Sequence, residues 1–132
     1  MISIILKQTK TTTMSFKKEN PVVKKSYAFA IRIVKCYQLL RSEKQSYDLA
    51  TQLVKSGTSI GANIEEAQGS ISKREFIAKM HISYKEVRET HFWLRLFRDT
   101  DILKSDFANS MLVDCEEILK LLTSILKSSK QT

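Results

Sequence analysis

Residues 47–68, YDLATQLVKSGTSIGANIEEAQ, carry the clearest helical pattern in this chain of 132 residues. At about 100° per residue, the apolar and small side chains of this stretch fall within about 140° of arc. They are Leu49, Ala50, Leu53, Val54, Gly57, Ile60, Gly61, Ile64 and Ala67. The pattern predicts an amphipathic helix with one buried face. Gly57 and Gly61 each cost about 1 kcal/mol relative to Ala in a helix, so close approach of a neighbouring helix is expected to offset them.

Capping residues mark the starts of two flanking helices. Asn20 and Pro21 are typical of an N-cap and a first helical position, because Pro gives up a backbone donor that has no helical partner. Ser72 and Glu75 form a capping box, which satisfies backbone donors of the first turn. A third apolar pattern follows a polar break at 99–101. Helices are therefore predicted over about 21–43, 73–98 and 104–128.

The composition supports an all-α domain. With Gly 3 and Pro 1, the chain has too little turn chemistry for a many-stranded β domain. Its length favours one domain, and 42% hydrophobic residues suffice for a packed core. Four helices with short connections predict an antiparallel up-and-down four-helix bundle over 21–128. Residues 1–20 are expected to form a flexible tail, with Met14 as an alternative start, and 129–132 a C-terminal tail.

The apolar faces of the predicted helices indicate which side chains meet in the core. On the first helix the stripe comprises Val23, Ser26, Tyr27, Ala30, Ile33, Val34, Tyr37 and Leu40. The third helix has a core face that includes Phe76, Met80, Val87 and Leu94, and a second apolar set on roughly the opposite side: Ile82, Phe92, Trp93 and Leu96. One chain cannot easily bury both faces. The second set is therefore predicted to be an interface between copies of the chain.

No pattern typical of an enzyme, a metal centre or a cofactor site is present in the sequence. His81 and His91 are ten residues apart, or about 15 Å along a helix, too far to share a metal within it. His91 is instead expected to be a hydrogen-bonded structural residue. Cys36 and Cys115 lie in apolar helical patterns and are predicted to be free core thiols in a reducing cytoplasm. We expect no catalytic residues, no metal and no cofactor.

The charge balance points to polyanions or acidic partners. The chain carries a formal net charge of +8, which attracts nucleic acid without specifying a fold. On the first helix, four basic residues share about 100° of arc opposite the core stripe, an arrangement that suits phosphate groups. These candidate nucleic-acid-binding residues are Lys24, Lys25, Arg32 and Lys35. An ordinary solvated face fits the same pattern.

The segment at 59–66, SIGANIEE, is unusual for a helix interior because it combines small residues, an amide and adjacent acids. We interpret it as part of a hydrogen-bonded seam between helices or subunits rather than as a ligand site. The predicted structural motif comprises Gly57, Ser59, Gly61, Asn63 and Glu66, with Ser56 in its polar flank. Glu86 and Arg88 on the third helix are candidate partners of the seam.

Several stretches resemble the four-helix-bundle proteins of the 23S rRNA intervening-sequence family. The most specific is TSIGANIEEA at 58–67; KENP at 18–21, KSYAFAIRIV at 25–34 and ETHFWL at 89–94 add to it. The resemblance spans about 18–126. Two departures stand out, since the family commonly has Arg shortly before the Ser-Ile-Gly segment and Ala-Glu-Gly at its close. Here Lys55 and Glu65-Glu66-Ala67 take these places, and Lys cannot form the bidentate contacts of Arg.

The resemblance implies a left-handed antiparallel bundle that assembles as a homo-oligomer, often a pentameric ring, with no established enzymatic activity. The related accessory proteins of diversity-generating retroelements look like basic pentameric bundles that bind nucleic acid and a reverse transcriptase. The leading hypothesis is therefore a non-enzymatic oligomer that binds RNA or DNA through a basic surface. The alternative is a protein–protein interaction adaptor without nucleic-acid binding.

The expected partners are another copy of the chain, RNA or DNA, and a nucleic-acid-processing protein. No membrane partner is expected, because no apolar run approaches the about 18 residues that a transmembrane helix requires. The apolar stretch at 2–6 is too short for the core of a signal peptide. We therefore expect a cytoplasmic protein.

Overall fold

The computed structural model describes residues 20–43 and 47–130, and over these residues the protein is all-α, without strands. Its four helices are α2 (Pro21–Ser42), α3 (Tyr47–Gln68), α4 (Lys73–Asp99) and α5 (Ser105–Lys130). The predicted helices are confirmed, and α5 continues two residues past its expected end at 128. The remainder of the two predicted tails lies outside the described residues. Within the described ranges, none of the helices is long and apolar enough to cross a membrane.

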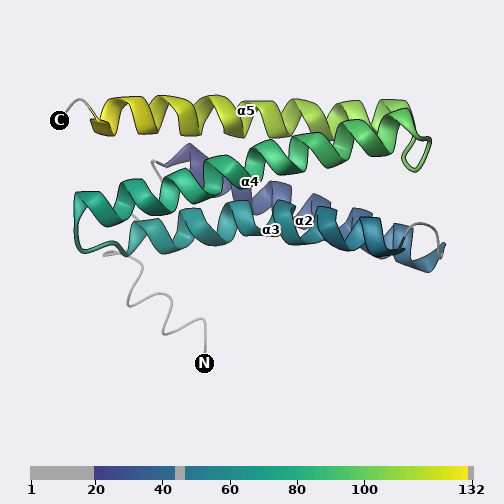
Figure 1. The fold of residues 1–132 in the computed structure, drawn as a ribbon, viewed down its shortest axis with the longest axis horizontal. Helices are drawn as coiled ribbons and strands as arrows, with labels where there is room; N and C mark the ends of the chain where they lie inside the picture. The colour runs from purple at the N-terminus through teal and green to yellow at the C-terminus, as the bar shows by residue number, and fades with distance from the viewer. Residues whose placement is uncertain (1–19, 44–46, 131–132) are drawn as a thin grey trace, which may run out of the picture.

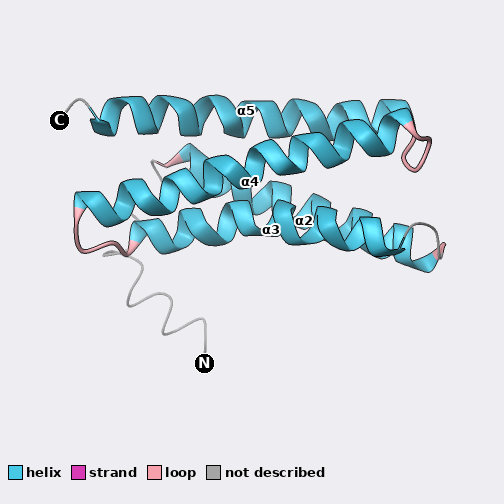
Figure 2. Ribbon diagram, viewed as in Figure 1, coloured by secondary structure: helices cyan, strands magenta, loops and turns pink. Residues whose placement is uncertain are grey.

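The helices form one elongated bundle in which neighbours in sequence are neighbours in space. α3 packs against α2 and α4, α4 against α5, and α5 returns to α2. Figure 1 shows α3 and α4 joined at one end of the bundle and α4 and α5 at the other. The loops at 69–72 and 100–104, which join α3 to α4 and α4 to α5, are short, as Figure 2 shows. A core of aliphatic and aromatic side chains from all four helices fills the space between them.

The helix starts differ in how their caps are made. Ser72 accepts a hydrogen bond from the backbone N–H of Glu75 at 3.0 Å, which confirms this part of the predicted capping box. Asn20 occupies the N-cap position of α2, but its side chain makes no capping bond. Its Nδ2 instead donates to Gln68 Oε1, at 3.1 Å. Asn20 therefore ties the start of α2 to the end of α3, a role that a local sequence pattern does not reveal.

The buried face of α2 is rotated relative to the predicted stripe. Tyr27 and Val34 were expected in the core, but they are 66% and 38% exposed. Their places are taken by Val22, Phe29 and Cys36, which are buried. The physical reason is that α2 packs on both α3 and α5, so its buried arc lies between these two neighbours.

Two glycines of α3 allow α2 to approach closely. A Cβ atom built on Gly57 would lie 2.8 Å from Cγ1 and Cγ2 of Ile33, which is fully buried. A Cβ atom on Gly61 would lie 3.3 Å from the backbone oxygen of Ser26. The expected close approach of a neighbouring helix is confirmed, and the contact offsets the helix-propensity cost of glycine.

Both cysteines are free and buried, as the sequence indicated. Burial raises the pKa of the Cys36 thiol to about 11. Burial, with smaller effects of Glu116 and Asp114, raises that of Cys115 to about 12. Both groups therefore remain neutral thiols at physiological pH and behave as apolar core residues.

Candidate functional site

The four predicted nucleic-acid-binding residues of α2 fall into two pairs with different surroundings. Lys25 Nζ lies 3.1 Å from Glu117 Oε1 of α5. Arg32 forms an ion pair with Asp114, and its Nη2 donates to Ser110 Oγ at 3.1 Å. Lys24 and Lys35 are exposed and form no ion pair with another described residue. Half of the predicted strip therefore pairs with acids of the neighbouring helix.

The acidic residues of α5 give Lys25 and Arg32 a structural role. The Arg32 guanidinium also lies over the Phe107 ring, 5.7 Å from its centroid, an attractive cation–π geometry. Arg32 is thus held by a carboxylate, a hydroxyl and a ring, all from α5. These contacts close the bundle between α2 and α5 and leave less positive charge for a ligand. The sequence pattern of α2 alone does not reveal the acids, because they lie more than eighty residues away along the chain.

Buried hydroxyl groups join α3 to α4. Thr90 Oγ1 lies 3.0 Å from Ser56 Oγ and 2.8 Å from the backbone oxygen of Glu86. Ser83 Oγ donates to the backbone oxygen of Ile60 at 2.8 Å. Ser56, Ser83 and Thr90 are almost fully buried, so each bond replaces one that water would otherwise make. The hydrogen-bonded seam expected around 59–66 is present between α3 and α4. On the α3 side, the Ser56 hydroxyl and the Ile60 backbone oxygen form these bonds.

The other polar residues of the predicted motif bond within α3 or at its surface. Asn63 Nδ2 donates to the Ser59 backbone oxygen at 2.8 Å and to Ser59 Oγ at 3.1 Å. Glu66 Oε1 lies 2.6 Å from Lys79 Nζ of α4, and this carboxylate raises the pKa of Lys79. Lys79 is therefore the partner of Glu66 that the sequence did not suggest.

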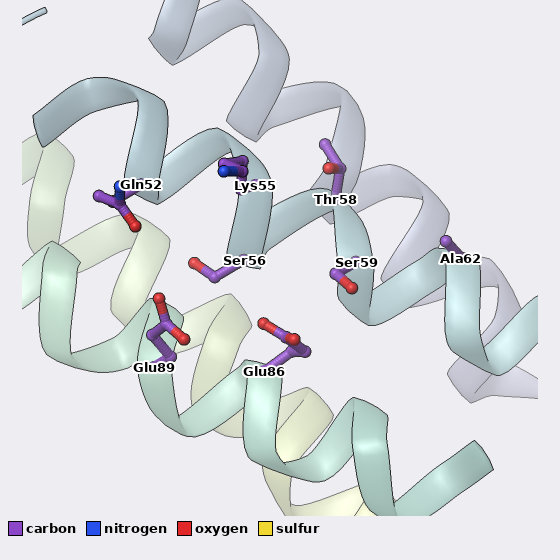
Figure 3. A pocket seen from close by; sticks show the side chains of 8 residues that line it. All are labelled: Gln52, Lys55, Ser56, Thr58, Ser59, Ala62, Glu86 and Glu89. Atoms are coloured by element: carbon purple, nitrogen blue, oxygen red, sulfur yellow. The ribbon is translucent and has the colours of Figure 1, made fainter. Parts of the chain in front are cut away.

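A polar groove runs along the outside of the α3–α4 seam. It encloses a cavity of about 630 Å³, and Figure 3 shows the Glu86 and Glu89 carboxylates extending from α4 toward Ser56 and Gln52 of α3. Burial and the nearby Glu89 raise the pKa of Glu86. Carboxylates, hydroxyls and the Lys55 ammonium line this space. Two carboxylates against one ammonium give this groove a negative charge, which disfavours phosphate.

Comparison with known proteins assigns the family. The family model for the 23S rRNA-intervening sequence protein matches residues 18–124, most of the chain. The chain belongs to this family. A crystal structure of a protein of unknown function from the S23 ribosomal protein family, from Bacteroides thetaiotaomicron VPI-5482, is 43% identical. The match has a TM-score of 0.78 and covers 80% of this chain and 98% of that one. No curated protein matches the chain.

The apolar face predicted on α4 is only partly exposed. Ile82 and Phe92 are 42% and 46% exposed. Trp93 and Leu96 are half-buried and pack against the core. Trp93 Nε1 also donates to Glu89 Oε2 at 3.0 Å. The exposed part of this apolar face is therefore narrower than predicted, because the fold already covers part of Trp93 and Leu96.

The second histidine of this family member is held by hydrogen bonds, as the sequence suggested. Arg95 Nε lies 3.1 Å from His91 Nδ1, and His91 Nε2 lies 2.9 Å from Glu116 Oε2. Because the arginine Nε–H can only donate, Nδ1 accepts and Nε2 carries the proton donated to Glu116. Arg88, a predicted partner of the α3 seam, instead lines a cavity with these residues on the α5 side of α4. The described part of the chain contains no group of His, Cys, Asp or Glu residues that could hold a metal.

Proposed function

We propose that the chain is a non-enzymatic, homo-oligomeric bundle of antiparallel helices that binds RNA or DNA through its basic surface in the cytoplasm. The observation that carries this proposal is the exposure of Lys24 and Lys35, without ion pairs among the described residues, in a chain with a net charge of +8. A pentameric ring would repeat this charge around a symmetry axis and strengthen the positive potential. The resemblance to retroelement accessory proteins supports the same role and a nucleic-acid-processing partner.

The positive charge is divided evenly between two parts of the chain. Residues 1–19 and 44–46 contain five lysines and Glu19, which gives +4, and 131–132 are uncharged. The described bundle therefore carries the other +4 (8 − 4). Both parts contribute to the long-range attraction of a polyanion, which depends on total charge rather than on one site.

Binding should weaken steeply as salt is raised, because lysine and arginine displace counterions from phosphates. The affinity of the full chain for labelled RNA and DNA is measured by fluorescence anisotropy. The NaCl concentration is raised from about 50 to about 200 mM, a range over which salt weakens such binding strongly. We expect a straight line of negative slope in a plot of log affinity against log salt. Absent binding, or binding that salt does not change, would overturn the nucleic-acid role.

The proposed interface between copies comprises Ile82, Phe92, Trp93 and Leu96 of α4. A charged residue in its centre should split the oligomer, since an unpaired charge at an interface is costly to desolvate. Trp93→Asp is expected to give smaller particles in sedimentation. Ile82→Asp, at a more exposed position, tests the same surface with less risk to folding, and Val113→Asp on α5 is the control. An unchanged mass for both α4 variants would place the interface elsewhere.

An adaptor without nucleic-acid binding is the second candidate, and an exposed apolar row on α2 favours it. Tyr27, Ile31 and Val34 are 66%, 43% and 38% exposed, and their spacing of four and three residues places them on one face. Such a row suits a protein partner. Capture of a protein partner that survives charge reversal of Lys25, Arg32 and Lys35, with no nucleic acid bound, would favour this function.

A further inference from the structure

The outer groove between α4 and α5 is built differently from the acidic groove between α3 and α4. One row of α4 side chains lines it, spaced alternately by four and three residues: Ile77, His81, Tyr84, Arg88, His91 and Arg95. This spacing places all six on one face of the helix. From residue 77 to residue 95 there are eighteen helical steps, or about 27 Å at the rise of an α-helix.

Two cavities lie along this row and are walled by α5. The first, of about 300 Å³, is lined by Arg88, His91 and Arg95 together with Leu119. The second, of about 370 Å³, lies beside His81 and Tyr84 and includes Lys127 and Lys130 near the end of α5. We call this pair of cavities and the α4 row the α4–α5 groove.

The charges in the α4–α5 groove are mostly positive. Arg88, Arg95, Lys127 and Lys130 line it, and Lys120 lies on the same face of α5, seven residues before Lys127. None of these five forms an ion pair with another described residue. Glu116 brings a carboxylate, which His91 Nε2 engages. The named side chains therefore leave a clear excess of positive charge, in contrast to Lys25 and Arg32 of α2.

Arg95 is held in position by neutral groups. Its Nε donates to His91 Nδ1 at 3.1 Å, and its guanidinium lies over the Phe92 ring, 6.0 Å from the centroid. Neither partner neutralises its charge. Asp99, one helical turn further along α4, lies near Arg95 but pairs with Arg98, so the two terminal nitrogens of Arg95 form no hydrogen bond with a described residue and can meet phosphate oxygens. A guanidinium fixed in this way forms bidentate contacts with phosphate at a lower entropic cost.

Aromatic rings line the same cavity as Lys127 and Lys130. His81 and Tyr84 have ring centroids 5.9 Å apart at an interplanar angle of 37°, and His81 is exposed. A basic track with aromatic rings along it is the combination by which proteins hold unpaired bases and their backbone. Bases of a duplex are already stacked on each other and cannot reach such rings.

We infer that the α4–α5 groove binds single-stranded nucleic acid, with Arg88 and Arg95 at two phosphates, Lys127 and Lys130 at others, and Tyr84 stacking against a base. This inference rests on the proposed nucleic-acid function and places it on a surface other than the α2 strip. α2 then contributes long-range attraction, and the α4–α5 groove makes the contacts.

The test compares two variants that each remove two exposed positive charges from the full chain. Arg88→Gln/Arg95→Gln changes the groove, and Lys24→Gln/Lys35→Gln is the matched control on α2. Binding of labelled oligouridine, oligothymidine and a DNA duplex of the same length is measured by anisotropy over a salt series. Thermal unfolding followed by circular dichroism verifies that each variant is folded.

We expect the unmodified chain to prefer the single strands to the duplex. The groove variant should lose about tenfold or more in affinity for them, and its salt slope should fall by about 1.4, the value for two phosphate contacts on a single strand. The control variant should lose about threefold or less, as expected for screened long-range attraction. Tyr84→Leu, which keeps the apolar packing, should lose about fivefold without a change in salt slope.

Equal losses of affinity in the two double variants, or a larger loss in the α2 control, would contradict binding in the α4–α5 groove. Either result would leave the proposed nucleic-acid function in place. Preference for the duplex by the unmodified chain would also contradict binding in the groove. Absence of binding to every probe by the unmodified chain would overturn the proposed function and the groove together. If oligouridine and oligothymidine bind with different affinities, the difference shows which single strand the groove favours. Either preference supports binding in the α4–α5 groove.

Discussion

Phe97→Ala should lower the free energy of unfolding by about 3–5 kcal/mol. The Phe97 ring is fully buried near the end of α4 and lies 6.1 Å from the Trp93 ring, between centroids. The backbone oxygen of Phe97 also accepts from the N–H groups of Ile102 and Leu103, at 2.9 and 3.1 Å. Truncation would leave a cavity beneath the turn into α5, where Asp101 has a positive φ of 64°. The surroundings can therefore collapse only in part.

Val113→Ala on α5 is the control, because the Val113 side chain is 65% exposed and lies outside the proposed interface. It should cost less than about 1.5 kcal/mol, the range of a partly solvated side chain. Urea unfolding followed by circular dichroism measures both variants at one protomer concentration, since self-association makes apparent stability depend on concentration. Similar losses for Phe97→Ala and Val113→Ala would contradict the assignment of Phe97 to the core.

Gly57→Ala should destabilise the bundle by about 1–3 kcal/mol, although alanine is the better helix former. The added Cβ would lie 2.8 Å from both Cγ atoms of Ile33. These atoms are attached to a branched Cβ in a fully buried side chain, so they cannot turn aside without disturbing the core. The cost of overpacking is therefore expected to exceed the gain in helix propensity.

Gly69→Ala provides the contrast at the end of α3, where the nearest atom to a new Cβ is a backbone oxygen at 3.7 Å. Its unfolding midpoint in urea should change little. A double variant, Gly57→Ala with Ile33→Ala, should be more stable than the sum of the single losses predicts, because the colliding atoms are gone. Strict additivity of the two single changes would show that Ile33 is not the obstacle.

Helix existence could be predicted from the sequence because it depends on local patterns. The period of the apolar residues, the proline at Pro21 and the Ser72–Glu75 box each act within a few residues and agree with one another. The small residues Gly57 and Gly61 also indicated a close helix contact correctly. The rotation of α2 could not be predicted, because periodicity defines an apolar arc but not the position of the two helices that cover it.

The candidate site was less predictable because its chemistry arises between helices. The four basic residues of α2 look alike in sequence, yet Asp114 and Glu117 of α5 neutralise two of them. The sequence pattern did not single out the α4 row: His91 was interpreted as structural, and Arg88 was assigned to the seam with α3. Only the packing of α5 beside α4 turns that row into a groove with a surplus of charge.

The buried hydroxyl bonds between α3 and α4 help to fix the position of each helix along its neighbour. Gly57 and Gly61 are one helical turn apart, so a slip of about 5.4 Å between α2 and α3 would still bring a small residue to the close contact. A matching slip between α3 and α4 would set Gln52 or Ile60 opposite Thr90 in place of Ser56, and a hydroxyl would lose its partner. The slipped register keeps a glycine at only one of the two close contacts, with Ser26 or with Ile33, and the serine and threonine hydroxyls disfavour it further.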